Sequence, residues 1–171
     1  MSLLSAQERS VSQNPNPTAG QVDVRGPRFA AWITTGVLVL VLLVSAFSVP
    51  AAAVLIGLQA IVFAIGALHG PRRSPYGRLF ATLVAPRLGP TTDTEPIPPL
   101  RFAQLVGFVF AAVGFIGFVA GAGVVGAIFT AFALFAAFLN AAFGICLGCL
   151  IYPLAQRLIQ RSPAESTGVT S

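Results

Sequence analysis

The sequence predicts an all-α, polytopic membrane protein whose four transmembrane helices are arranged as two hairpins. Of the 171 residues, 56% are hydrophobic and only 9% are charged, which is more apolar surface than a soluble domain of this size can bury. Four apolar stretches, each about long enough to cross roughly 30 Å of hydrocarbon, lie at 29–48, 51–68, 102–120 and 124–150. Short uncharged turns join the first stretch to the second and the third to the fourth, which predicts the hairpins.

These stretches define a membrane domain at 28–155 between two polar tails. Residues 1–27 and 156–171 contain too few apolar side chains to form a core, so we expect both tails to be disordered and cytoplasmic. A secretory signal peptide is the rival interpretation of the first stretch, because small residues follow it. That stretch is longer than a typical signal-peptide core, and a second stretch follows at once, which favours a membrane span.

The basic residues predict the orientation. All ten are arginines, and they precede the first stretch, lie in the central loop at 70–101, or follow the fourth stretch. By the positive-inside rule these three segments are cytoplasmic. We therefore expect a multi-pass protein of the inner (plasma) membrane with both termini in the cytoplasm. The net charge of +5 does not indicate nucleic-acid binding, because no aromatic and basic interleaving or known binding motif accompanies it.

The central loop contains a candidate amphipathic helix. Ser74 suits the N-cap and Pro75 the first helical position, and apolar residues recur with helical spacing from Tyr76 to Val84. We expect this helix to lie on the inner leaflet, and docking against a partner is the alternative. The basic residues expected to meet anionic head groups are Arg72, Arg73, Arg78 and Arg87.

Small residues predict how the membrane helices pack, because lipid supplies no hydrophobic drive and close backbone approach becomes important. The third helix carries a seam of Gly107, Gly114, Gly117 and Gly121, and the fourth carries Asn140, Gly144, Gly148 and Tyr152 at a spacing of four. We expect these two faces to form the central contact. Gln59 and Asn140 both fall near mid-membrane, where a hydrogen bond between the two amides would satisfy them.

The chain's only cysteines, Cys146 and Cys149, are three residues apart, a spacing that permits a disulfide on a helix. In a continuous fourth helix they lie near the cytoplasmic edge of the membrane and away from the glycine seam. That position is toward a helix C-terminus, where the helix dipole disfavours a thiolate. His69 ends the second stretch at a similar depth, and it is either a catalytic partner or part of an ordinary helix C-terminus. One cysteine pair and one histidine supply at most three ligands, so no metal is expected.

Other chemistries have little support in the sequence. The spans contain no ionisable residue, which disfavours transport of charged solutes. The five acidic residues lie in the tails or the loop, so paired carboxylates and a Ser–His–Asp set are not indicated. We expect no cofactor.

Four segments, VDVRGPRFAAW, GPRRSPYGRLF, RFAQLVGFVFAAVG and LNAAFGICLGC, give the chain a resemblance over 22–154. It resembles a family of short actinobacterial membrane proteins that is catalogued as a domain of unknown function. Members of that family tend to be encoded near thiosulfate sulfurtransferases and thioredoxin-like proteins. The resemblance therefore implies a thiol or sulfur role for Cys146 and Cys149, although it implies no defined activity.

Two functions follow as hypotheses. In the first, the cytoplasm-facing cysteine pair takes part in thiol–disulfide exchange or sulfur relay with a soluble thioredoxin-like or sulfurtransferase partner. In the second, the protein is a non-enzymatic structural or accessory subunit that packs through its glycine-rich faces into a homo-oligomer or a larger membrane complex. The sequence does not decide whether the protein is an enzyme.

Overall fold

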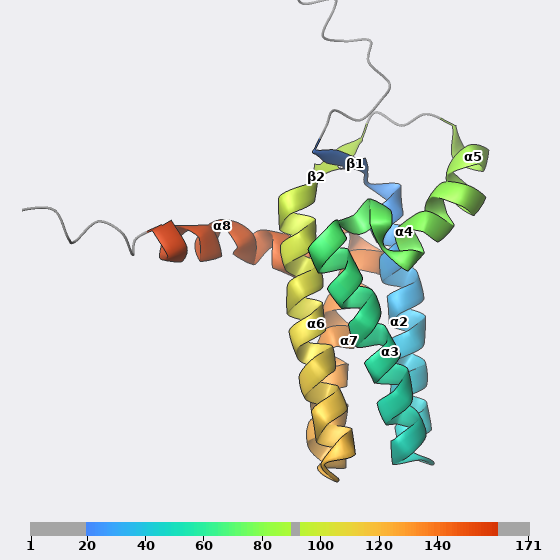
Figure 1. Ribbon diagram of the computed structural model, residues 1–171. Helices are drawn as coiled ribbons and strands as arrows, with labels where there is room; N and C mark the ends of the chain where they lie inside the picture. Colours follow the sequence, from blue (N-terminus) through green and yellow to red (C-terminus); the bar gives the residue numbers. More distant parts are fainter. Residues whose placement is uncertain (1–19, 90–92, 161–171) are drawn as a thin grey trace, which may run out of the picture.

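Four long helices form an up-and-down bundle in the computed structural model, which describes residues 20–89 and 93–160 (Figure 1). They are α2 (Arg25–Ser45), α3 (Val49–His69), α6 (Ile97–Val119) and α7 (Gly123–Phe143). Each is long and apolar enough to cross a membrane, so the predicted all-α fold class with four membrane-spanning helices is confirmed. Around the bundle α3 packs on α2 and α6, and α7 packs on α2 and α6.

The two ends of the bundle differ in chemistry. The end that carries the turns at 46–48 and 120–122 is the turn end, and the opposite end is the arginine-rich end. The arginines of the described residues that gather there are Arg25, Arg28, Arg72, Arg73, Arg78, Arg87, Arg101 and Arg157; Arg9 and Arg161 lie outside the described residues. The short elements at this end are β1 (Gln21–Asp23), a 3-10 turn (Pro71–Arg73), α4 (Pro75–Leu79), a π-helical turn (Phe80–Val84), α5 (Ala85–Leu88), β2 (Thr94–Pro96) and α8 (Leu147–Gln160).

A two-stranded ribbon joins the starts of the two hairpins. β1 pairs antiparallel with β2, with Val22 opposite Glu95, and the guanidinium of Arg72 donates to the carbonyl of Gln21 at 2.8 Å. The prediction of a tail at 1–27 is therefore wrong for residues 20–27, because the partner strand supplies hydrogen bonds that composition does not reveal. Residues 1–19 of that predicted tail lie outside the described residues.

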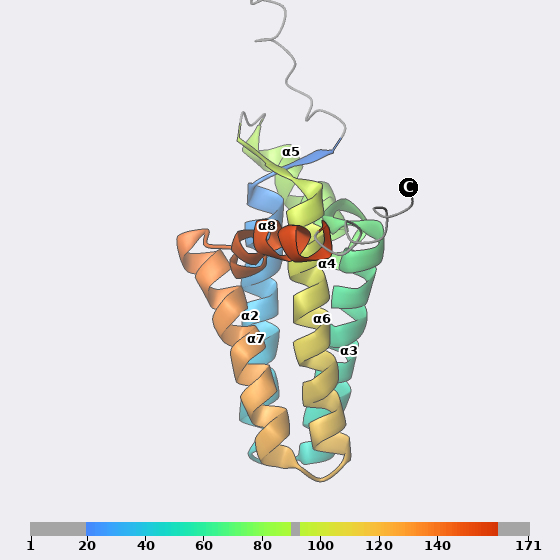
Figure 2. The ribbon, with the colours of Figure 1, turned by 90° about the vertical axis from the view of Figure 1, so that its left-hand side faces the viewer.

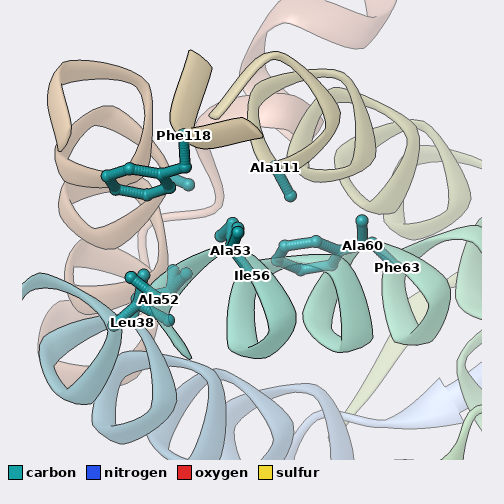
Figure 3. Packing of buried hydrophobic residues seen from close by; sticks show 10 residues of the cluster. Leu38, Ala52, Ala53, Ile56, Ala60, Phe63, Ala111 and Phe118 are labelled. Atoms are coloured by element: carbon teal, nitrogen blue, oxygen red, sulfur yellow. The ribbon is translucent and has the colours of Figure 1, made fainter. Parts of the chain in front are cut away.

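The bundle is tight toward the turn end because glycines let α6 and α7 approach closely. A Cβ added to Gly117 would lie 2.7 Å from the backbone nitrogen of Gly126, and one added to Gly114 would lie 3.2 Å from the Thr130 hydroxyl. The adjoining core, shown in part in Figure 3, consists of small and branched side chains with two phenylalanines: Leu38, Val41, Ala52, Ala53, Ile56, Ala60, Phe63, Ala111, Phe118 and Ala133.

Toward the arginine-rich end, α6 and α7 diverge (Figure 2). Phenylalanines replace glycines between them: the ring of Phe110 lies 6.0 Å from that of Phe129 and 6.2 Å from that of Phe132, centroid to centroid. Bulky side chains hold helix backbones farther apart than glycines do. The sequence thus produces a bundle that is closed at the turn end and wider at the other.

The central loop folds back onto the bundle through two aromatic residues. The hydroxyl of Tyr76 donates to Oε1 of Gln59 at 2.7 Å, and the buried ring of Phe80 packs 5.7 Å from that of Phe29. The expected hydrogen bond between Gln59 and Asn140 is therefore wrong, since a loop side chain reaches Gln59 instead. The predicted amphipathic segment is only partly free for a membrane surface, and its exposed apolar side chains are Leu79 and Leu83.

Replacing Tyr76 by Phe is expected to destabilise the bundle by about 1–3 kcal/mol, because the buried Gln59 amide then loses its partner. Gln59 is 1% exposed, and its Nε2 already lacks a partner among the described residues. Burial raises the pKa of Tyr76, which keeps the hydroxyl protonated as the donor. Reversible unfolding in mixed micelles measures the effect.

Tyr152→Phe is the matched control for that substitution. The hydroxyl of Tyr152 accepts from Gln156, which is exposed, so water replaces the lost bond and the change is expected to be close to neutral. Equal losses in the two variants would contradict the role assigned to the Tyr76–Gln59 bond.

The fourth span ends earlier than predicted. α7 stops at Phe143, and Gly144 takes a left-handed φ of +69° as the C-cap, a conformation that glycine adopts without steric cost. After Gly144 the chain turns, and α8 lies across the long axis of the bundle (Figure 1). The continuous span at 124–150 and the tail at 156–171 are thus corrected: residues 147–160 are helical, and 161–171 lie outside the described residues.

Candidate functional site

The cysteine pair lies at the N-terminus of α8. Cys146 and Cys149 form a disulfide with a Cα–Cα separation of 5.2 Å. The carbonyl of Cys146 accepts the first helical hydrogen bond, from the backbone N–H of Leu150 at 3.1 Å, so Cys146 occupies the N-cap position. Its Sγ accepts from the backbone N–H of Cys149 at 3.3 Å. A sulfur atom here fills the role that a Ser or Asp oxygen fills at other N-caps.

This position reverses the electrostatic expectation for the pair. A helix N-terminus presents unpaired N–H groups and the positive end of the dipole, both of which favour a thiolate over a thiol. The expectation of a C-terminal setting assumed that the fourth helix continues through Gly144. Because the helix breaks there and a new one begins at Leu147, the cysteines gain the favourable end of a helix.

Arg28 adds a cation beside this helix start. A Cβ built on Gly144 would lie 2.7 Å from Nη2 of Arg28, so the guanidinium sits against the glycine two residues before Cys146. Burial raises the pKa of Glu95, and the nearby Arg28 lowers it in part. Arg28 therefore interacts electrostatically with Glu95 of the ribbon and also contacts Gly144, in the segment that leads into α8.

The two sides of α8 differ. Apolar residues follow a helical stripe that consists of Leu147, Leu150, Ile151, Leu154 and Leu158. At about 100° per residue Cys149 lies on the opposite side of the helix from that stripe. Gly148 fixes the helix against α6, since a Cβ added there would lie 2.5 Å from the Cα of Ala103, and the ring of Tyr152 packs 5.8 Å from that of Phe102.

A cavity of about 650 Å³ lies beneath the start of α8, in the wider half of the bundle. Its walls come mainly from α2, α6 and α7, and Cys146 lines it, whereas Cys149 does not. Most of the lining is apolar, with aromatic side chains from three helices. The polar side chains that line it from within the spanning helices are Thr34, Gln104 and Asn140.

Comparison with known proteins gives a family but no function. Residues 22–157 match the family described as Domain of unknown function (DUF4395). The chain belongs to this family. No curated protein and no solved structure matches the chain. The DUF4395 match begins in β1 and ends within α8, so it includes both hairpins, the ribbon and the cysteine pair.

Within the DUF4395 domain, the predicted packing residues have several different roles. Gly114 and Gly117 face Gly126 of α7, and Gly107 faces Phe63 of α3. Gly121 has a φ of +79° in the turn, with open space around it. The remaining three predicted residues do not meet the glycine seam as expected: Asn140 lines the cavity, Gly144 is the α7 C-cap, and Gly148 packs on α6 from α8.

His69 is the last residue of α3 and is exposed. The carbonyls just before it are capped by Arg101, whose Nε and Nη2 donate to Ala67 and Leu68 at 2.8 Å. No hydrogen bond among the described residues joins His69 to either cysteine, and no cluster of three metal-ligating side chains occurs in the same part of the chain. The side chains of Arg72, Arg73, Arg78 and Arg87 are exposed at the arginine-rich end.

Sequence reasoning missed Arg28, Gln104 and the whole of α8 as parts of this DUF4395 site. A signal for α8 was present: Gly144 can end a helix, and the stripe that starts at Leu147 is amphipathic rather than uniformly apolar. Arg28 and Gln104 carry no local signal, because only the bundle topology brings them to the cavity and to the start of α8.

Proposed function

We propose that this protein is an inner-membrane thiol–disulfide exchange component whose Cys146–Cys149 pair reacts with a soluble thioredoxin-type dithiol. The observation that carries the proposal is the N-cap position of Cys146, with its sulfur bonded to the N–H of Cys149. Reactive cysteines need a setting that stabilises the thiolate and remains accessible. Both cysteines are half-buried at the edge of the bundle, which fits that requirement.

The arginine-rich end supports a cytoplasmic location for the pair. The described arginines gather at the end that carries α8, and the positive-inside rule puts such an end in the cytoplasm. With the stripe of α8 toward the membrane, Cys149 faces water. Arg73, Arg78 and Arg87 are placed to meet anionic head groups or an acidic partner surface.

The exchange proceeds in two balanced steps. A partner thiolate forms a bond to Sγ of Cys149, and the Cys146–Cys149 bond breaks, so that Cys146 leaves as a thiolate. The partner's second thiolate then attacks the mixed disulfide, which releases Cys149 as a thiolate that takes up a proton. Two electrons move from the partner to the pair. Cys146 is the better leaving group because the helix N-terminus stabilises its thiolate.

Sulfur relay is the related reaction at the same atoms. A sulfurtransferase persulfide gives its outer sulfur to the Cys149 thiolate, and the donor cysteine leaves as a thiolate. Intact-protein mass spectrometry separates the two reactions, because only relay adds one sulfur atom to the protein.

A mixed-disulfide trap tests the proposed function. In Cys146→Ser, Cys149 is first converted to a mixed disulfide with thionitrobenzoate. A purified thioredoxin whose second active-site cysteine is replaced by Ser then attacks Sγ of Cys149 and releases thionitrobenzoate, so a stable mixed disulfide with thioredoxin is expected to accumulate. Cys149→Ser is the matched control and is expected to yield much less adduct, because its remaining sulfur faces the cavity. Non-reducing electrophoresis and mass spectrometry identify the adduct.

Absence of adduct from both single variants, with the wild-type pair remaining oxidised in the presence of reduced thioredoxin, would contradict the proposal. In that case a stoichiometric membrane partner that survives replacement of both cysteines would instead favour an accessory subunit. Purification in mild detergent provides that comparison.

A further inference from the structure

We propose that the cavity beneath α8 binds a lipophilic quinone, which oxidises the Cys146–Cys149 dithiol. This inference rests on the proposed function and names the electron acceptor of the same site. The first observation is the position of Cys146, the one cysteine of the pair that lines the cavity. A bound ring there would lie next to the sulfur that leaves as a thiolate in the exchange reaction.

The second observation is the chemistry of the walls. The cavity volume of about 650 Å³ falls within the range of small-molecule sites, which are mostly apolar with a few convergent polar groups. Phe63, Phe110, Phe132 and Phe135 line it, and aromatic faces suit a flat ring.

The third observation is unused hydrogen-bonding capacity in the walls. No hydrogen bond among the described residues engages the side-chain amides of Gln104 and Asn140, which line the cavity from α6 and α7. Thr34 lines it from α2 and is 5% exposed. Amide and hydroxyl groups within a mostly apolar lining match the carbonyl oxygens of a quinone. A bare hydrocarbon chain would leave them unsatisfied.

The fourth observation is the route of entry. Phe132, Phe135 and Ile151 line the cavity and are also exposed, at 55%, 58% and 49%. These side chains belong to α7 and α8, at the side of the bundle that faces lipid. A ligand dissolved in the bilayer can therefore enter between them without passing through water. Asp23, Arg72 and Ser74 line the cavity at the ribbon and the central loop, and the apolar rim on α7 and α8 is the part that favours a membrane-soluble electron acceptor.

The reaction balances without a further reagent. The Cys146 thiolate adds to a carbonyl carbon of the quinone and forms an S–C bond. The Cys149 thiolate then attacks Sγ of Cys146, which forms the disulfide and breaks the S–C bond, and the electron pair of that bond goes to the ring. Two electrons pass to the quinone. The two thiol protons, taken up from solution at the ring oxygens, complete the quinol.

The test uses reduced full-length protein in phosphatidylglycerol–phosphatidylcholine nanodiscs. The acceptor is a benzoquinone with a decyl tail and a fully substituted ring, because such a ring has no C–H position at which a permanent thiol adduct could form. We expect one quinol per cysteine pair, read from the ultraviolet absorbance of the quinone, together with reformation of the disulfide. Cys146→Ser and Cys149→Ser are expected to abolish quinol formation.

Substitutions in the cavity distinguish oxidation by a quinone bound there from direct reaction of the quinone with exposed thiols. Ala136→Phe fills the cavity and is expected to slow quinol formation at least tenfold, whereas Ala131→Phe adds the same ring on an exposed face of α7 and is expected to leave the rate unchanged. Asn140→Leu removes one amide while keeping the branched shape and the number of heavy atoms of the side chain, and it is expected to weaken quinone binding.

Quinol formation that is equally fast in wild type, Ala136→Phe and Asn140→Leu would overturn the proposal, and so would its absence in the wild type. The thioredoxin trap is run on the same preparations. If the mixed disulfide with thioredoxin forms but quinol does not, the quinone site is refuted and the proposed exchange function stands. If neither product forms, both the quinone site and the exchange function are refuted.

Discussion

Gly117→Ala is expected to destabilise the bundle by about 1–3 kcal/mol, the usual cost of overpacking. The added Cβ would lie 2.7 Å from the nitrogen and 3.0 Å from the Cα of Gly126. These are backbone atoms of α7, so no side-chain rotation relieves the contact and the helices must separate. The loss is expected in spite of the roughly 1 kcal/mol that alanine gains over glycine in helix propensity.

Gly36→Ala is the matched control, because Gly36 lies inside α2 with no atom within 4 Å of an added Cβ. It is expected to be neutral or stabilising. Unfolding in mixed micelles, followed by circular dichroism, gives both free energies. Similar values for the two variants would show that the close approach of α6 and α7 is not as described.

Gly148→Ala is expected to loosen the start of α8 and to slow thiol exchange. Its Cβ would lie 2.5 Å from the Cα of Ala103 and 2.6 Å from the Cβ, so the first turn of α8 must move away from α6. A cost of about 1–3 kcal/mol corresponds to roughly 5- to 150-fold faster amide exchange in that turn. The Cys146 thiolate then loses part of the ordered N–H that stabilises it, so exchange with thioredoxin slows.

Hydrogen exchange with mass spectrometry measures the first effect, and the rate of disulfide reduction by thioredoxin measures the second. Gly123→Ala is the control, because Gly123 is also at a helix start and has open space around it. Unchanged protection of α8 in Gly148→Ala would contradict the packing of this helix on α6.

The sequence was sufficient for the elements that depend on local composition. Four apolar stretches predict four spans, and Gly114 and Gly117 indicate close helix approach, because both signals lie within one segment. Features that depend on distant partners were not predictable in the same way. The ribbon needs residues 21–23 and 94–96 together, and Gln59 finds Tyr76 rather than Asn140 because the loop folds back.

The candidate site shows the same division. The spacing of Cys146 and Cys149 predicts a disulfide-compatible pair, but its electrostatic setting depends on the backbone at Gly144. A glycine inside an apolar run is compatible both with a helix contact and with a left-handed cap. The helix-contact interpretation of Gly144 puts the cysteines at the C-terminus of a helix, whereas the structure has them at an N-terminus. The cavity that Cys146 lines is formed by several helices, so no single segment of the sequence predicts it.

We propose that Cys146 and Cys149 form a redox-active pair rather than a static crosslink. A redox titration of the protein in nanodiscs, with thiols alkylated at each potential and counted by mass spectrometry, tests it most directly. We expect a single two-electron transition within the range of thioredoxin and glutaredoxin dithiols, about −270 to −200 mV. A pair that stays fully reduced or fully oxidised across that range would contradict it.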